Sequence, residues 1–262
     1  MSDVLVLCYH AVSAVWSAGL SVTPERLERQ LAGLLARGYE GATFTDAVLN
    51  PTASRTIAVT FDDAYRSVID LAGPVLRSLQ IPGTVFVPTA FAGSEQPMAW
   101  PGIDQWHGGP HEDELVPMSW DELGRLAGDG WEIGSHTEHH PRLPELGRAA
   151  LGEELQRSRA ECEARLSVAC TSLAYPFGDH DAMVAEAAHE AGYLAAGALA
   201  GRVRTQSALS WPRVGIYHDD DDLRFRLKSS PPLRRLRASR AWRIRFLLRR
   251  ERAAPSGPDS PN

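Results

Sequence analysis

Short apolar runs alternate with helix-patterned segments along most of this chain, and this alternation restricts the folds open to it more than any other feature. The runs lie at 4–9, 57–59, 84–87, 131–134 and 173–175. Such runs are typical of strands buried on both faces of a sheet. Strands that alternate with helices at these lengths predict a parallel sheet with helical crossovers, either open or closed into a barrel.

Helix start signals mark the intervening segments. A threonine, a proline and a glutamate at 23–25 combine an N-cap, a proline suited to the first helical position and an acid, and leucines at helical spacing follow until Gly38. Ser119 and Glu122 form a capping-box pattern ahead of a helix expected to reach about residue 127. Further helices are expected at 65–79, 146–166 and 182–191.

The size and the charge of the chain set its organisation. With 262 residues, 44% of them hydrophobic, it is able to bury a substantial core, and this length fits one α/β barrel-sized domain better than two. The formal net charge of −6 conceals an asymmetry, because residues 224–252 hold twelve lysines and arginines against one acid. The total charge therefore says little about partners, whereas the basic segment requires its own interpretation.

The cysteines and the amino-terminal residues bear on the compartment. Cys8, Cys162 and Cys170 are an odd number without metal-type spacing, which argues against a disulfide framework. The first ten residues lack a basic region, and their apolar run is too short for a signal peptide or a membrane span. The sequence therefore predicts a cytoplasmic protein with reduced thiols.

Carboxylates and imidazoles follow three of the runs at the point where each run ends. Asp62 and Asp63 come after the run at 57–59, the histidine-rich residues 135–140 follow the run at 131–134, and His10 ends the first run. In a barrel of parallel strands, residues after the carboxyl ends of the strands gather at one mouth. An aspartate and two histidines would supply three ligands for zinc or a similar ion and leave a position open for catalysis.

The motifs together resemble those of a known family. Thr-Phe-Asp-Asp at 60–63, His-Thr-x-x-His at 136–140 and Leu-Ala-Tyr-Pro-Phe-Gly at 173–178 are similar to the successive motifs of the polysaccharide deacetylases, carbohydrate esterase family 4, also called the NodB homology domain. The likeness extends from about Val4 to about Tyr217 and rests on the order of the motifs. It implies a distorted, incomplete (β/α) barrel of about seven strands.

The resemblance also implies a domain division and an activity. It places a catalytic domain at 1–223, followed by the basic segment at 224–252 and a short polar, proline-rich tail at 253–262 that we expect to be disordered. The implied reaction is metal-dependent removal of N-acetyl groups from a sugar. A carbohydrate O-acetyl esterase with the same site and a catalytically silent relative that binds a glycan or a partner are the alternatives.

Site roles follow from the resemblance residue by residue. Asp63, His136 and His140 would bind the ion, most suitably zinc, with cobalt, nickel and manganese as alternatives. Asp62 would act as general base on the water that attacks the acetyl group. His139 is the alternative to His140 as the second imidazole ligand, although the spacing of the motif favours His140.

The third motif predicts part of the oxyanion site. Its residues Tyr175, Pro176 and Phe177 would border the groove for the acetyl group and offer a backbone N–H to the oxyanion. Many family members carry an arginine, which orients the base, where this chain has Ala174. We expect Arg213, in a Trp-Pro-Arg-Val segment similar to one branch of the family, to pair with Asp62 instead, the alternative being an ordinary surface arginine.

The leaving amine needs a proton donor, for which histidine is the usual choice. His10 lies in a Tyr-His segment similar to that of the poly-N-acetylglucosamine deacetylase branch, where an early histidine takes this role. A structural role for His10 and a catalytic role for His218 are the alternatives. Trp106, in the long connection at 93–117, is expected to line a lid or a sugar subsite, unless this connection is a variable insertion.

The basic segment at 224–252 leaves several partners open. Its arginines and Trp242 would suit an interfacial helix on anionic lipid, and this would fit a lipid-linked glycan substrate. A solvated or partner-binding tail is the alternative. The sequence argues against nucleic acid as a partner, since no known nucleic-acid motif accompanies the charge.

Overall fold

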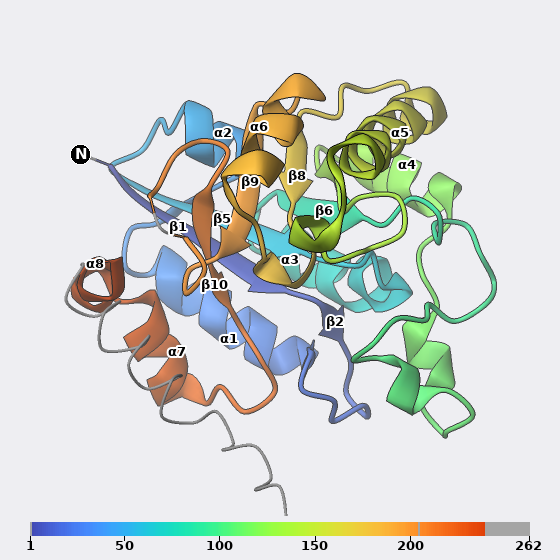
Figure 1. Cartoon of the computed structure of the whole chain (residues 1–262). Coiled ribbons are helices and arrows are strands. Elements are labelled where there is room, and N and C mark those ends of the chain that lie inside the picture. Colours follow the sequence, from blue (N-terminus) through green and yellow to red (C-terminus); the bar gives the residue numbers. More distant parts are fainter. Residues whose placement is uncertain (1, 204, 239–262) are drawn as a thin grey trace, which may run out of the picture.

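A closed ring of parallel strands is the centre of the fold. The computed structural model describes residues 2–203 and 205–238. Hydrogen bonding around the ring runs β1-β10-β9-β8-β7-β6-β5 and returns to β1 (Figure 1). The strands are β1 (Asp3–Tyr9), β5 (Arg55–Phe61), β6 (Gly83–Val87), β7 (Glu132–Ser135), β8 (Ser172–Ala174), β9 (Ala195–Leu199) and β10 (Trp211–Gly215). The predicted barrel of about seven strands is confirmed.

The ring is distorted, because neighbouring strands pair over very different lengths. β1 and β5 pair along the whole length of both strands, whereas β7 and β8 pair only where Ser135 lies opposite Leu173. A short extra strand, β4 (Glu40–Ala42), shares one edge of β5 with β6. It pairs with residues 56–58, and β6 pairs with residues 59–61. Beside the ring, β2 (Ala11–Val12) and β3 (Ser21–Val22) form a parallel pair.

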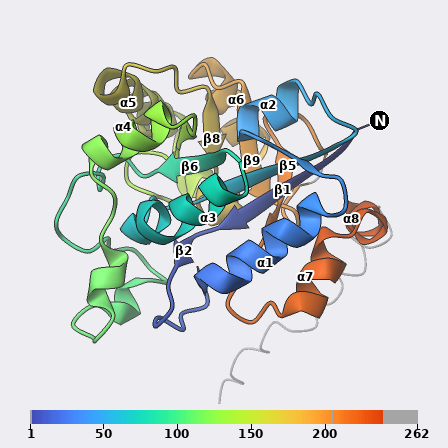
Figure 2. The same ribbon diagram turned by 180° about the vertical axis from the view of Figure 1, so that it is seen from behind.

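Helices surround the ring, with α1 and α3 along one flank and α5 and α6 along another (Figures 1 and 2). Their bounds are α1 (Pro24–Leu35), α2 (Phe44–Leu49), α3 (Gly73–Ser78), α4 (Trp120–Gly128), α5 (Arg148–Leu166), α6 (Ala182–Glu190), α7 (Asp222–Ser229) and α8 (Pro231–Ala238). Short helical turns occupy Val68–Ala72, Asp104–Trp106, Glu112–Leu115, Leu143–Glu145 and Pro176–Gly178. No helix in the described ranges has the length and apolar character needed to cross a lipid bilayer.

The predicted helix caps are present in the structure, and one predicted helix differs from its expected form. The Thr23 side chain accepts a hydrogen bond from the Arg26 N–H, and Ser119 and Glu122 form both bonds of a capping box. The helix expected at 65–79 is instead a wide helical turn followed by the short α3. Pro74 explains the break, because proline has no N–H to continue the hydrogen-bond ladder of a regular helix.

The strands alternate between an outer face that packs on helices and an inner face made largely of small residues. Ile57, Val59 and Phe61 of β5 join the main core with α1 and α3, while Ala58 joins a separate cluster. This cluster fills the amino-terminal end of the ring, where α2 contacts β1, β5 and β9. Its buried members are Val6, Phe44, Ala47, Val48, Ala58, Phe86, Ala174 and Ala195.

Two glycines on the inner face leave space for two large side chains. A Cβ atom at Gly134 would lie 2.6 Å from the ring of Phe86, and one at Gly197 would lie 2.5 Å from Cδ of Arg213. The Arg213 guanidinium itself lies over the Phe86 ring, 5.3 Å from its centroid. A barrel of this size has little interior volume, so an arginine fits inside only where the neighbouring strand has a glycine beside it.

Candidate active site

The two aspartates leave β5 through a turn with unusual backbone angles. The Asp62 N–H donates to the carbonyl of Tyr9 (2.9 Å), so the pairing with β1 continues one residue past the strand. The next two residues, Asp63 and Ala64, have φ angles of 69° and 55°, in the left-handed region that non-glycine residues rarely adopt. This turn separates the consecutive carboxylates, and each has its own set of partners.

Asp63 lies with the two histidines of the His-Thr-x-x-His motif. Its Oδ1 is 3.4 Å from Nε2 of His136 and 3.4 Å from Nε2 of His140. The three potential ligand atoms lie within 4.8 Å of one another, and all three residues are buried. His136 follows β7 directly and is held by its backbone N–H, which donates to the carbonyl of Val87 (2.8 Å).

His139, the alternative ligand, is outside this group. Its side chain is 58% exposed, and its Nδ1 bonds Oε1 of Glu154 on α5 at 2.7 Å. His140, whose φ is 58°, instead places its Nε2 3.4 Å from Oδ1 of Asp63. The structure thus brings together His136 and His140, the pair favoured by the spacing of the motif.

The chemistry of the donor set fits a divalent ion. Asp63 Oδ1 is buried with no hydrogen-bond partner in the described part of the chain, as expected for an atom whose lone pairs serve a ligand. Nδ1 of His136 bonds the carbonyl of Ala174 (2.8 Å), which leaves Nε2 free for an ion. Burial lowers the pKa of His140 to about 3, so this imidazole is neutral, the form that binds metals.

Asp62 is clamped by Arg213 from β10. Nη1 and Nη2 of the arginine donate to the two carboxylate oxygens at 2.6 and 2.8 Å, and both side chains are buried. The thiol of Cys8 also donates to Oδ2 of Asp62, at 3.4 Å. Burial alone would raise the pKa of Asp62, but the charges of Arg213 and His136 offset it and hold that pKa well below its usual value.

Replacing Arg213 by methionine should therefore cost both stability and base function. The change leaves the Asp62 carboxylate buried without its counter-charge, which typically costs about 3–5 kcal/mol. It should also raise the pKa of Asp62, so the acid limb of the pH–rate profile should move to higher pH. Chemical denaturation measures the first effect, and steady-state rates across pH measure the second.

A surface ion pair provides the control for this change. Arg202 lies 3.5 Å from Asp179 and is 38% exposed, so Arg202→Met should change the unfolding free energy by less than about 1 kcal/mol. The double change Arg213→Met with Asp62→Asn should recover much of the lost stability, because no buried charge then remains unpaired. Equal losses for Arg213→Met and Arg202→Met would contradict the assigned pairing.

Of the two histidines considered as proton donor, His10 lies beside the carboxylates. One of its nitrogens lies within 4.8 Å of both the Cys8 sulfur and an oxygen of Asp62, and its Nδ1 is buried with no partner among the described residues. His218 follows β10, with its N–H donating to the carbonyl of Gly19 and its own carbonyl accepting from Arg26, and among the described residues it forms no group with Asp62 or Asp63.

The turn of the third motif holds its three residues in different ways. Tyr175 points into the core, where its hydroxyl donates to the carbonyl of Leu209 (2.8 Å), and its N–H donates to Gly197 (3.0 Å). Pro176 has no N–H. Phe177 has a φ of 58°, and its ring lies 4.7 Å from that of His140. Within the described residues, its N–H is the one in this trio without an acceptor.

The long connection after β6 reaches the site through a residue that sequence reasoning did not select. Trp100 is buried and stacks on the ring of His140, with centroids 4.3 Å apart and planes 27° apart. Trp106 packs edge-on against Trp16 at 5.5 Å and near His111 at 6.2 Å. Both tryptophans are in the same segment, and the sequence carries no signal that separates them.

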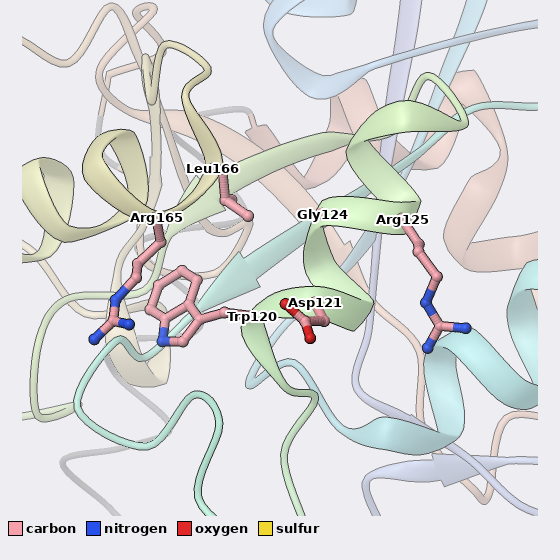
Figure 3. Close-up of a pocket in the computed structure, with 6 residues that line it drawn as sticks. All are labelled: Trp120, Asp121, Gly124, Arg125, Arg165 and Leu166. Carbon is pink, nitrogen blue, oxygen red and sulfur yellow. The ribbon is translucent and has the colours of Figure 1, made fainter.

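A shallow pocket between α4 and α5 lies apart from this group of residues (Figure 3). Arg165 lies over the Trp120 ring at 5.9 Å, and Arg125 extends from the other side of α4. Asp121 is the one carboxylate among its six lining residues, and none of the residues predicted for the site contributes to it. This pocket therefore has no part in the predicted chemistry.

The described part of the basic segment is tied to the protein surface. Lys228 of α7 pairs with Asp220 at 2.5 Å, and Arg234 of α8 pairs with Asp3 at 2.5 Å. Residues 239–262, which include most of the arginines and Trp242 invoked for a lipid contact, lie outside the described residues. The membrane interpretation thus stays a prediction.

Comparison with known proteins points to one family. The family profile described as polysaccharide deacetylase matches residues 49–196. The protein YxkH of Bacillus subtilis (strain 168), which carries the same family in its name, is 24% identical over 193 residues. The match covers 72% of this chain and 61% of YxkH, so the chain spans less than two thirds of that relative.

Solved structures show the same fold at low sequence identity. A de-N-acetylase from Aggregatibacter actinomycetemcomitans has a TM-score of 0.71 at 16% identity, over 86% of this chain and 99% of that one. The deacetylase PplD of Streptococcus pyogenes has a TM-score of 0.69 at 19% identity, and the match covers 87% of this chain and 99% of PplD. IcaB from Ammonifex degensii has a TM-score of 0.69 at 21% identity, and the match covers 91% of this chain and 98% of IcaB.

Proposed function

This chain belongs to the polysaccharide deacetylase family, and from that premise we propose that it hydrolyses the N-acetyl group of an N-acetylated sugar. The substrate would be a polysaccharide, an oligosaccharide or a lipid-linked glycan precursor. One observation carries the proposal: the buried group of Asp63, His136 and His140 lies directly beside an Asp62 carboxylate held by Arg213. These groups would supply the ligands and the base for metal-assisted hydrolysis of an amide.

Asp63 Oδ1 and the Nε2 atoms of His136 and His140 would hold a divalent ion, and their donor types suit zinc best, with cobalt, nickel and manganese also acceptable. When bound, such an ion lowers the pKa of water and polarises a carbonyl. This cofactor assignment rests on the donor set and on the family of the chain.

The remaining residues supply proton transfers and charge stabilisation. Asp62 would take a proton from the water that attacks the acetyl carbon, and Arg213 would keep the carboxylate ionised and oriented. The free N–H of Phe177 would donate to the oxyanion of the tetrahedral intermediate. As the C–N bond breaks, His10 would give a proton to the departing amine, and acetate and the free amino sugar would leave.

Acetate release from N-acetylglucosamine oligomers and from lipid-linked N-acetyl sugars tests this proposal. The protein is first reconstituted with zinc or cobalt, and acetate and free amine are measured together, because amide hydrolysis yields them in equal amounts. Asp62→Asn, measured in parallel, controls for contaminating hydrolases. Release only from O-acetylated sugars would favour an esterase. No release from either class, with metal bound, would favour a catalytically silent relative.

His10→Ala should lower turnover of N-acetyl substrates by about 10²-fold, since general acids typically contribute 10²- to 10⁴-fold. Metal content should stay the same, because His10 is not among the three ligands. His218→Ala is the control and should retain wild-type turnover. A His10→Ala protein that binds metal normally and keeps full turnover would remove His10 from the mechanism.

A further inference from the structure

The segment that carries both histidine ligands has a strained backbone. Thr137 and His140 have φ angles of 69° and 58°, in the left-handed region that costs non-glycine residues free energy. Such a conformation persists only where the surrounding structure holds it in place. The contacts made by this segment, 136–140, therefore decide whether its imidazoles stay aimed at Asp63.

Every backbone N–H in segment 136–140 has an acceptor. The N–H of His136 donates to the carbonyl of Val87 on β6, and those of Thr137 and His140 donate to the hydroxyls of Ser135 and Thr137. The middle two, at 138 and 139, donate to a side chain from a different helix. That side chain is Glu154, in the second turn of α5.

Glu154 makes three bonds to the segment with one carboxylate. Its Oε2 accepts from the N–H groups of Glu138 and His139, both at 3.0 Å, and its Oε1 bonds Nδ1 of His139 at 2.7 Å. Only 14% of its side chain is exposed. Glu154 thus binds the segment at residues 138 and 139, between His136 and His140, whose imidazoles lie near Asp63.

The same face of α5 supports the base of the segment. Ser158, four residues after Glu154 and therefore on the same side of the helix, bonds the hydroxyl of Ser135 at 2.6 Å. Ser135 in turn accepts from the N–H of Thr137 (3.0 Å). One helix face therefore restrains the segment at two successive points.

We propose that Glu154 is a positioning residue for the metal centre, which holds segment 136–140 in its strained form and so fixes His140 relative to Asp63. His136 is secured independently, by Val87 at its backbone and Ala174 at its ring. The His140 ring packs against Trp100 and Phe177 but has no hydrogen bond to fix its Nδ1, which is buried without a partner in the described ranges. The inference rests on the proposed function, since it assumes that the three residues bind an ion.

Glu154→Met tests the proposal, because methionine keeps the length and helix preference of the side chain and removes both acceptors. Binding of Zn²⁺ and Co²⁺ to the metal-stripped full chain is measured by competition with a chromophoric chelator. The dissociation constant should rise about 10- to 100-fold, the usual effect of removing a group that orients a ligand. Glu154→Gln should recover much of the affinity, because its amide oxygen still accepts from both N–H groups.

Glu153→Met is the matched control. Glu153 is the neighbouring residue on α5, but its side chain is 63% exposed and pairs only with Arg157 at 3.1 Å among the described residues. The dissociation constants of Glu153→Met for Zn²⁺ and Co²⁺ should stay within about twofold of those of the wild type. The thermal midpoint of each metal-stripped variant shows whether the fold is intact.

The outcomes separate the positioning role from a general structural role. Weaker metal binding in Glu154→Met, with partial rescue by Glu154→Gln, supports the proposal. A Glu154→Met protein that binds both ions as tightly as Glu153→Met overturns it, whatever its thermal midpoint. A wild-type protein that binds metal yet releases no acetate would count against the proposed function and leave the affinity comparison valid.

Discussion

Asp62→Asn should lower turnover of N-acetyl sugars by about 10²- to 10⁴-fold, the range that a positioned general base contributes. The amide keeps the shape of the side chain but is a very poor proton acceptor. Metal affinity should change little, because Asp62 is bound by Arg213 and is not among the atoms that converge on Asp63. The measurement is steady-state acetate release by fully metal-loaded protein.

A second buried carboxylate serves as the control for Asp62→Asn. Asp220 is also buried and forms an ion pair with Lys228 at 2.5 Å. Among the described residues, no predicted site residue forms a hydrogen bond with Asp220. Asp220→Asn should therefore reduce stability without reducing turnover. If Asp62→Asn retained wild-type turnover, the assignment of Asp62 as base would be wrong.

Removing the ion should have the largest effect of all. Lowering the pKa of water from about 15.7 toward 7 is worth on the order of ten kcal/mol for forming the nucleophile. Chelation should therefore bring acetate release to the background level, and added zinc or cobalt should restore it. His136→Ala should lower metal affinity and turnover together, because it removes one of three ligands from a buried site.

His139→Ala is the control for this experiment, because it removes an exposed histidine from the same segment. Its imidazole lies 2.7 Å from Glu154 and outside the group around Asp63. It should bind metal far more tightly than His136→Ala does. Full turnover by wild-type protein after exhaustive chelation, with metal analysis confirming the loss, would refute a metal-dependent reaction.

Much of the fold and the outline of the site could be predicted from the sequence. Buried parallel strands are short apolar runs, and polar residues at their ends mark the mouth of a barrel, as at Asp62 after β5 and His136 after β7. The apolar runs predicted five of the seven ring strands; β9 and β10, of five residues each, were missed, as were β4, of three residues, and α2, of six. Elements of this length have too little periodicity to be distinguished from loops.

Other details of the site depend on tertiary contacts that no local pattern records. Two adjacent histidines follow the same strand, and although the spacing of the motif favours His140, the contact that holds His139 away from Asp63 is made by Glu154 of a distant helix. Trp100 and Trp106 lie in one segment, yet only Trp100 stacks on His140. Such distinctions arise from packing between elements far apart in the chain.

The placement of Arg213 inside the barrel has a consequence for how this scaffold divides its tasks. The arginine approaches Asp62 from β10, through space left by Gly197, and occupies none of the loops at the mouth. Orientation of Asp62 is thus built into the strands, while the connections between them are where residues for binding the proposed glycan substrate are expected. Exchange of the connections beyond the predicted site residues would change substrate range and leave the pairing of Arg213 with Asp62 intact, so in an evolving lineage the two properties are free to change separately.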